Sequence, residues 1–177
     1  MTLTAQETSS ALVVDVETAE VIRQFLYREA RLLDEWQFEE WLECYHPEAS
    51  FWMPAWDVDD TLTSDPQNEI SLIWYPDRSG LEDRVFRIRT DRSAATSLPE
   101  PRTEHNLGGI EFLSRDGDQV EVRFSWTTHY YRYQSTLTYY GHSLYTLDLS
   151  GRAPVIRDKK VILKNDTVHQ IIDIYMI

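Results

Sequence analysis

The sequence predicts an α+β fold in which a long, curled antiparallel sheet wraps around N-terminal helices. Three observations predict it. Apolar residues recur at helical spacing near the N-terminus. From Arg102 onward, apolar and polar residues alternate, as they do in a half-buried strand. The pair Asp116-Gly117 separates two of these alternating stretches and is a strong hairpin signal.

The chain has 177 residues, which suits one domain, and its apolar fraction of 42% is enough for a core. We expect residues 1–14 to form a flexible tail and residues 15–177 to form a single α+β domain. Asp15 is placed to cap a first helix near Val16, because apolar residues follow at helical spacing.

The other elements of the first half are short. Asp34 is placed to cap a second helix, which Pro47 ends. The acidic stretch 57–69 has no apolar period, so we expect it to be mobile or held against another surface. The remaining elements are expected in the order strand 49–56, strand 70–76 and helix 79–93.

The second half predicts a run of strands. Alternate residues from Val120 to Tyr130 are apolar and share one face, and those between them share the other. We expect the next turn at residues 134–136, followed by a strand that carries Tyr139 and Tyr145 on one face. The last two strands are expected at 155–166 and 168–177.

Composition excludes several classes of protein. The net charge of −13 argues against nucleic acid and against an anionic membrane surface, since both bind through Lys and Arg. No apolar run approaches the roughly 20 residues of a membrane span, and the N-terminus lacks the features of a signal peptide. The single cysteine, Cys44, fits a cytoplasmic protein. One cysteine and five scattered histidines are too few for an iron–sulfur cluster or a Cys-rich zinc site, so we expect no cofactor on this chain.

The stretch "REARLLDEWQFEEWLECYHPEASFWMP", followed by alternating strands, resembles the cone-shaped, cystatin-like or nuclear transport factor 2-like fold of ketosteroid isomerase and scytalone dehydratase. A closer resemblance covers nearly the whole chain from about residue 20. The small (β) subunit of aromatic-ring-hydroxylating dioxygenases, most of all the benzoate and toluate 1,2-dioxygenase branch, has segments similar to "EISLIWYPDRSGLEDRVFRIRTDRSAAT", "RTEHNLGGIE", "YYRYQST" and "VILKNDTVHQIIDIYMI".

This resemblance implies a non-catalytic structural subunit. The large α subunit of such enzymes carries a Rieske 2Fe-2S cluster and a mononuclear iron, and a separate reductase supplies electrons from NADH through FAD. The reaction adds both atoms of dioxygen to benzoate and gives a cis-diol carboxylate. The resemblance further implies a hexamer of three α and three β subunits. The alternative is a free-standing lyase or isomerase of the cone fold that acts on a small hydrophobic ligand.

Several polar residues are candidates for chemistry in that alternative. Asp34, with His129 or His142 as its partner, is placed to act as a general base, although we expect it to cap a helix instead. His105, next to Asn106, is a further base candidate, and we expect it to be structural. The helix expected at 79–93 carries four arginines that suit either an anionic substrate or acidic side chains: Arg84, Arg87, Arg89 and Arg92.

The stretch "YYRYQSTLTYYGHSLY" contains six of the ten tyrosines of the chain. Tyrosine suits a surface that is partly wet and partly buried, and six tryptophans are many for this length. Because aromatic residues concentrate at protein interfaces, we expect a contact with another subunit there. The candidate interface residues are Trp52, Trp56, Trp74, Tyr131, Tyr133, Tyr139 and Tyr140.

Overall fold

The structure is a computed structural model, and it describes residues 13–90, 99–165, 168 and 171–177. The expected division into a tail and one domain stays a prediction. Residues 1–12 lie outside the described residues, and Val14 is already buried in the core. The long helix α1 (Val16–Asp34) follows and is capped by Asp15, whose carboxylate accepts a hydrogen bond from the Thr18 amide at 2.7 Å.

Within the described residues, three α-helices and a short 3-10 helix accompany six strands. The expected order of helices, two strands, a helix and then a run of strands is confirmed. After α1 the elements are α2 (Phe38–Leu42), β1 (Tyr45–Pro54), β2 (Ser71–Tyr75), α3 (Ser79–Arg89), β3 (Arg102–Asp116), β4 (Gln119–Arg132), β5 (Ser135–Asp148), β6 (Val155–Leu163) and the 3-10 helix η1 (Ile174–Met176).

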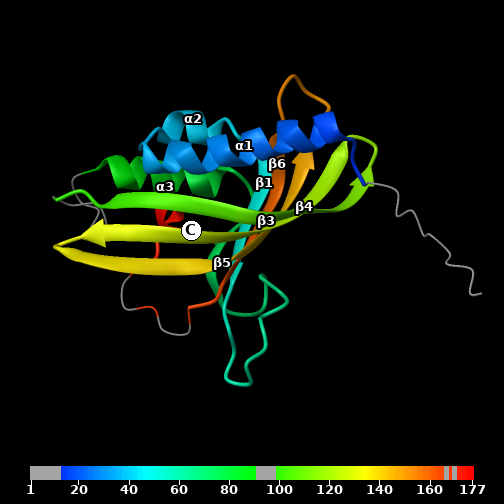
Figure 1. The fold of residues 1–177 in the computed structure, drawn as a ribbon. Coiled ribbons are helices and arrows are strands. Elements are labelled where there is room, and N and C mark those ends of the chain that lie inside the picture. Colours follow the sequence, from blue (N-terminus) through cyan, green and yellow to red (C-terminus); the bar gives the residue numbers. More distant parts are fainter. Residues whose placement is uncertain (1–12, 91–98, 166–167, 169–170) are drawn as a thin grey trace, which may run out of the picture.

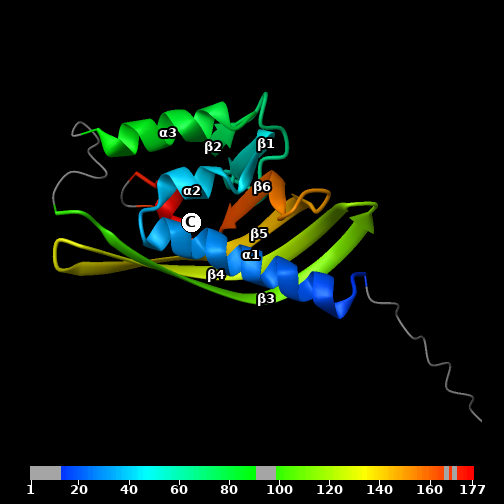
Figure 2. The ribbon, with the colours of Figure 1, turned by 90° about the horizontal axis from the view of Figure 1, so that it is seen from above.

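The strands form one curled sheet in the order β2-β1-β6-β5-β4-β3. Every pair of neighbouring strands is antiparallel except β1 with β6, which is parallel. The sequence analysis expected a purely antiparallel sheet, so this one pair differs from the prediction. The helices lie on one side of the sheet, and the C-terminal segment is enclosed between the two layers (Figures 1 and 2). This arrangement is the expected α+β cone.

The core lies between the helices and the inner face of the sheet. On β4, alternate residues from Val120 to Tyr130 are buried, which confirms the predicted inner face. The prediction of a last strand at 168–177 was wrong. Among the described residues of this stretch, Ile174 to Ile177 are all buried, whichever way each side chain points. Their apolar character reflects complete enclosure rather than the two-residue period of a strand.

Two turns differ by a residue from the prediction. Asp116 pairs with Gln119, so Gly117 and Asp118 form the first turn, with Gly117 at φ 58°. The pairing of Arg132 with Ser135 places the second turn at residues 133–134, instead of 134–136. Tyr133 and Gln134 there have φ values of 52° and 60°, in the left-handed region. Such values are uncommon for residues other than glycine.

The acidic stretch 57–69 is held by its own hydrogen bonds. It forms a narrow loop that extends away from the sheet (Figure 1). Thr63, at its base, is buried, and its hydroxyl donates to the Ile70 carbonyl at 2.9 Å. The Glu69 carboxylate accepts from the Asp65 amide at 2.7 Å, which lowers the pKa of Glu69.

Candidate functional site

A charged pair occupies the interior of the cone. Glu29 on α1 and Lys159 on β6 are 3% and 2% exposed, and Lys159 Nζ lies 3.0 Å from Glu29 Oε1. Trp41 Nε1 and the Tyr45 hydroxyl donate to the same oxygen at 2.8 and 2.9 Å. Burial alone would raise the pKa of Glu29, but Lys159 and these hydrogen bonds hold that pKa below its usual value. The carboxylate is therefore ionised at neutral pH.

Aromatic rings surround the ammonium group of Lys159. Its Nζ lies 5.9, 5.2 and 5.1 Å from the ring centroids of Trp41, Phe51 and Tyr145, within the range of cation–π attraction. This pair satisfies itself with groups of its own chain, so it serves packing rather than ligand chemistry. The sequence analysis missed the pair, although Glu29 falls at helical spacing from the buried Ile22.

Asp34 does not cap α2, so the cap prediction was wrong. Helix α1 extends through Asp34, the chain then turns at Trp36 with φ 58°, and the N-cap of α2 is Gln37, which makes no side-chain cap bond. Asp34 instead binds His105. Its carboxylate accepts from the His105 amide at 2.9 Å, and its Oδ1 lies 2.6 Å from His105 Nδ1. Burial opposes the charge of Asp34, but its bonds to His105 lower its pKa overall.

The two histidines expected beside Asp34 do not reach it. His129 and His142 lie on the outward face of the sheet, and Asp34 lies on the inward side, with α1. His129 Nδ1 is 3.2 Å from the Thr138 hydroxyl. Burial, followed by neighbouring cations, lowers the pKa of His142. Asn106 is exposed. Of the expected candidates, the structure thus brings together only Asp34 and His105.

The arginines of α3 bind acidic side chains of their own chain. Arg84 forms a two-pronged ion pair with the buried Asp173, in which Nε lies 2.7 Å from Oδ1. This pair fastens the C-terminal segment to α3. Arg89 binds Glu39, in the first turn of α2, at 2.5 Å. Arg87 is exposed, and Arg92 lies outside the described residues. Neither Arg84 nor Arg89 is left free for an anionic substrate.

Cys44 is packed in the core. It is 1% exposed, and burial, followed by the charge of Glu29, raises its thiol pKa to about 12. It is therefore uncharged at neutral pH and unreactive. Within the described part of the chain, no group of three His, Cys, Asp or Glu side chains is arranged to hold a metal ion. No helix there is long and apolar enough to cross a membrane.

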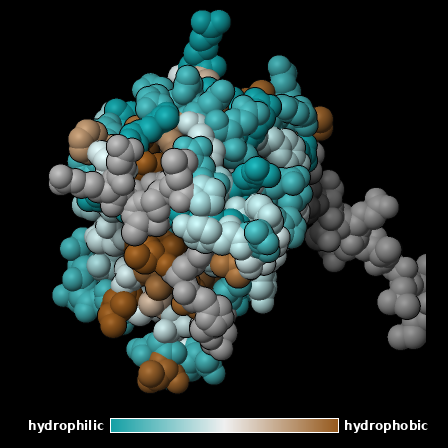
Figure 3. Space-filling view, turned by 90° about the vertical axis from the view of Figure 1, so that its left-hand side faces the viewer, coloured by the Kyte–Doolittle hydropathy of each residue, from teal (hydrophilic) through white to brown (hydrophobic). Residues whose placement is uncertain are grey.

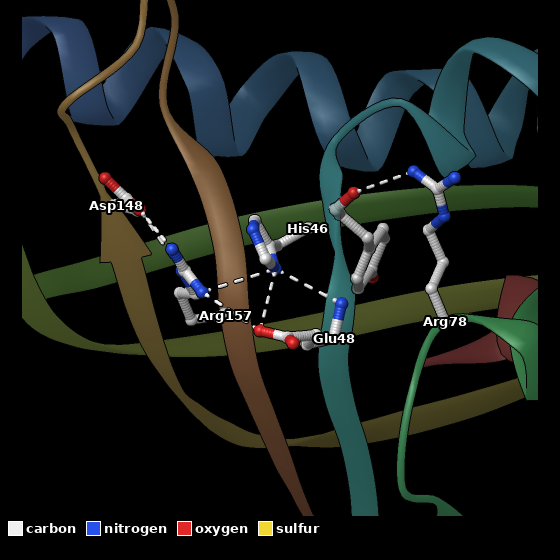
Figure 4. Close-up of polar contacts among 6 residues, drawn as sticks. His46, Glu48, Arg78, Asp148 and Arg157 are labelled. Carbon is white, nitrogen blue, oxygen red and sulfur yellow. Dashed lines mark hydrogen bonds and ion pairs between the residues drawn. The ribbon is translucent and has the colours of Figure 1, made fainter.

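A polar cluster around Arg157 joins three strands (Figure 4). Arg157 on β6 donates to Asp148 Oδ2 from Nε at 3.1 Å and from Nη2 at 2.9 Å. Its Nη1 lies 3.3 Å from His46 Nδ1 and 3.7 Å from Glu48 Oε2. The pairing of β1 with β6 is interrupted between Tyr45 and Ser50. The cluster fills that interruption, and its polar groups bind one another.

The tryptophans near the edge of the sheet face outward. Trp52 and Trp74 stand opposite each other on β1 and β2 and meet edge to face, with 6.5 Å between ring centroids. Lys160 Nζ lies 4.2 Å above the Trp52 ring. Trp56 donates to a backbone carbonyl of β6 at 2.7 Å, and Lys164 Nζ lies 4.7 Å from its ring. Positive charge therefore accompanies the exposed rings on this otherwise acidic protein.

Three of the four candidate tyrosines lie on the surface. Tyr131, Tyr133 and Tyr140 are 42%, 66% and 49% exposed. Tyr139 is 3% exposed and packs against Tyr130 in the core, so it does not belong to the outward set. Figure 3 views the molecule from the end that carries the turn between β4 and β5. Hydrophobic side chains gather in the lower half of this face, and hydrophilic ones cover the upper half.

The fold and its interior define a class of protein: a cone-shaped domain whose central charged pair binds groups of its own chain, with aromatic side chains on the outward face of its sheet. Residues 28–170 match the family model described as "Ring hydroxylating beta subunit". The chain belongs to this family of β subunits of ring-hydroxylating dioxygenases. The resemblance seen in the sequence is thereby confirmed.

Two curated relatives are similar over nearly the whole chain. Benzoate 1,2-dioxygenase subunit beta of Acinetobacter baylyi is 57% identical over 169 residues, which are 96% of this chain and 99% of the relative. Toluate 1,2-dioxygenase subunit beta of Pseudomonas putida is 54% identical over 156 residues, which are 88% of this chain and 96% of the relative.

Solved structures agree in fold. The β subunit of the benzoate 1,2-dioxygenase of Burkholderia mallei aligns with a TM-score of 0.76 and 48% identity, and the alignment covers 94% of this chain and 100% of the other. A structure from Novosphingobium aromaticivorans assigned as a scytalone dehydratase aligns with a TM-score of 0.64 and 10% identity, over 89% and 93% of the two chains. The second likeness shows only the shared cone fold.

Proposed function

We propose that this chain is the non-catalytic structural β subunit of a cytoplasmic benzoate 1,2-dioxygenase. The identity of 57% to a benzoate 1,2-dioxygenase β subunit, over 96% of the chain, carries the proposal. The interior supports it, because the charged groups at the centre of the cone bind one another.

The cofactors of the reaction belong on another chain. A Rieske cluster needs two cysteines and two histidines, and this sequence has one cysteine. Membership of this family implies that the partner is an α subunit that holds the Rieske cluster and the mononuclear iron, in a complex of three α and three β subunits. A reductase that carries FAD passes electrons from NADH to this complex. Those groups supply the oxidation chemistry, and the β subunit supplies surface for assembly.

The contact surface that we propose is the outward face of the sheet. It comprises the exposed Trp56, Tyr131, Tyr133 and Tyr140, together with the half-buried Trp52 and Trp74, and leaves out Tyr139. Aromatic side chains gain the most from burial at an interface. Lys160 and Lys164, which lie over two of the tryptophan rings, would meet acidic groups of the partner.

Coexpression with the α chain of the same enzyme tests the proposal. The copurified complex should contain iron and, with its reductase and NADH, oxidise benzoate faster than toluate, anthranilate or halobenzoates. The β chain alone should contain no stoichiometric iron and show no turnover. A failure to copurify with any ring-hydroxylating α chain, or turnover of a hydrophobic ligand by the β chain alone, would favour the lyase or isomerase.

A further inference from the structure

Four buried polar atoms on the inner faces of β3 and β4 have no hydrogen-bond partner among the described residues. One is Thr103 Oγ1, and the other three, which lie side by side, are His105 Nε2, Trp126 Nε1 and Thr128 Oγ1. Solvent does not reach them, because Thr128 is 0% exposed, Trp126 is 4% exposed and the side chain of His105 is 3% exposed. Leaving a buried donor or acceptor unbonded costs free energy, and buried polar groups normally have a partner.

The three side chains are neighbours in the sheet. His105 on β3 stands directly opposite Thr128 on β4. Trp126 lies two residues away along β4 on the same face, which is about 7 Å. Helix α1 lies over β3 and β4 in Figure 2, and its last residue, Asp34, binds His105. The strands and the end of α1 therefore enclose this group of polar atoms.

The bond to Asp34 decides which role each atom plays. An ionised carboxylate only accepts hydrogen bonds, so His105 Nδ1 donates to Asp34, and in the tautomer with this single ring proton Nε2 is an acceptor. The indole N–H of Trp126 is only a donor, and the hydroxyl of Thr128 does both. A molecule that complements this set must donate to Nε2 and accept from its neighbours. The oxygen of a hydroxyl group meets both requirements.

We propose that the inner face of β3 and β4, beneath Asp34, is an internal binding site for a hydroxyl-bearing guest. The guest O–H donates to His105 Nε2, and its oxygen accepts a hydrogen bond from Trp126 or Thr128. Water is the smallest guest of this kind, and a phenol or an alcohol presents the same group. The site lies on the opposite side of the sheet from the proposed subunit contact and does not depend on the dioxygenase assignment.

Replacement of Thr128 by valine in the full chain tests the site, since valine keeps the shape and removes only the hydroxyl. If the hydroxyl binds a guest, Thr128→Val removes a hydrogen bond and lowers the melting temperature by about 2–4 °C. If the hydroxyl is unbonded, the change removes a penalty and raises the melting temperature. An unchanged or higher value therefore overturns the proposal. Thr127→Val, on the outward face of the same strand, is the matched control and should change little.

Two further measurements identify the guest. Crystals of the wild-type chain should show density beside His105 Nε2 that is lost in Thr128→Val, and its absence from the wild type would contradict the proposal. Phenol and toluene are then titrated against both chains. A rise in melting temperature with phenol, but not with toluene, in the wild type alone shows that an organic guest binds. With density present and no such rise, water is the guest.

Discussion

The pair Glu29–Lys159 shows what a single charged contact does in this core. Removing two charges from water is expensive, and the cost is offset only when every group finds a partner. Here Trp41 and Tyr45 complete the bonding of the carboxylate. Helical spacing alone would have placed Glu29 on the buried face of α1. Its partner was not predictable, because 130 residues separate Glu29 from Lys159 and only the folded sheet brings them together.

Removing one member of this pair should destabilise the chain strongly. Glu29→Gln and Lys159→Met each leave an unpaired buried charge or donor, and we expect each to lower the free energy of unfolding by about 3–5 kcal/mol. The double variant should lose less than the sum of the two. Urea unfolding of the purified chain measures all three. Glu35→Gln is the control, because its ion pair with Arg31 is exposed, and it should change stability by under about 0.5 kcal/mol. Additive losses would show that the pair is not coupled.

Asp148 should make stability depend on pH in the acid range. Hydrogen bonds from Ser150, and then from Arg157, lower its pKa from 3.8 to about 2. A carboxyl whose pKa is lower in the folded state than in the unfolded state stabilises the fold. This stabilisation is fully present at pH values above the pKa of the unfolded state and is lost as the pH falls through the pKa of the folded state. The free energy of unfolding should therefore fall between pH 3.8 and about 2. Asp148→Asn should make this decline shallower in urea titrations at stepped pH. An identical slope in the variant would exclude the carboxylate as the cause.

At the scale of elements, two-residue alternation predicted β3 to β6 because one face of those strands is buried and the other exposed. The same argument failed for the C-terminal segment, since Ile174 to Ile177 are all buried and so keep no such period. The boundary between α1 and α2 was misplaced at Asp34. Its carboxylate suits a helix cap, and only the distant His105 draws it away. Tertiary contacts of this kind leave no signal in the local sequence.

The close approach of β5 to its neighbours depends on Gly141. A Cβ atom there would clash with the Ile162 carbonyl oxygen on β6 and lie 3.1 Å from Trp126 Cζ2 on β4. Gly141→Ala should therefore lower the free energy of unfolding by about 1–3 kcal/mol, as overpacking does. Gly108→Ala on β3 is the matched control, because a Cβ at that position meets nothing within 4 Å. Equal effects of the two changes in denaturant unfolding would contradict the packing argument.

At the scale of the whole molecule, the two faces of the sheet differ in what they contact. The inner face meets the helices of its own chain, and the outward face carries exposed rings. At the tip of the β4–β5 hairpin, Tyr133 and Gln134 have left-handed backbone values that Asn and Gly adopt more easily. Positive φ at both positions is what a two-residue type I′ hairpin turn requires, and Tyr133 in this turn is 66% exposed.

Single replacements of the outward tyrosines should weaken assembly before they weaken folding. At least one of Tyr131→Ser, Tyr133→Ser and Tyr140→Ser should shift the complex with the α chain toward free subunits in sizing chromatography, while circular dichroism stays unchanged. A buried aromatic anchor at an interface contributes ~2 kcal/mol or more. Tyr27→Ser is the control, since Tyr27 is 44% exposed on α1, away from the proposed contact. Normal assembly of all three variants, or altered substrate preference in an intact complex, would refute the contact.

The position of β6 between β1 and β5 has a consequence for synthesis on the ribosome. The first strand to be synthesised, β1, lies between β2 and β6 in the sheet. The edge of β1 that pairs with β6 therefore has no partner until residue 163 has left the exit tunnel. Until then, the nascent chain exposes two unpaired strand edges, which invite aggregation. Lys159 also lies on β6, so Glu29 has no ion-pair partner until nearly the whole chain has been synthesised. Chaperone binding during translation should thus persist until β6 emerges and then end abruptly.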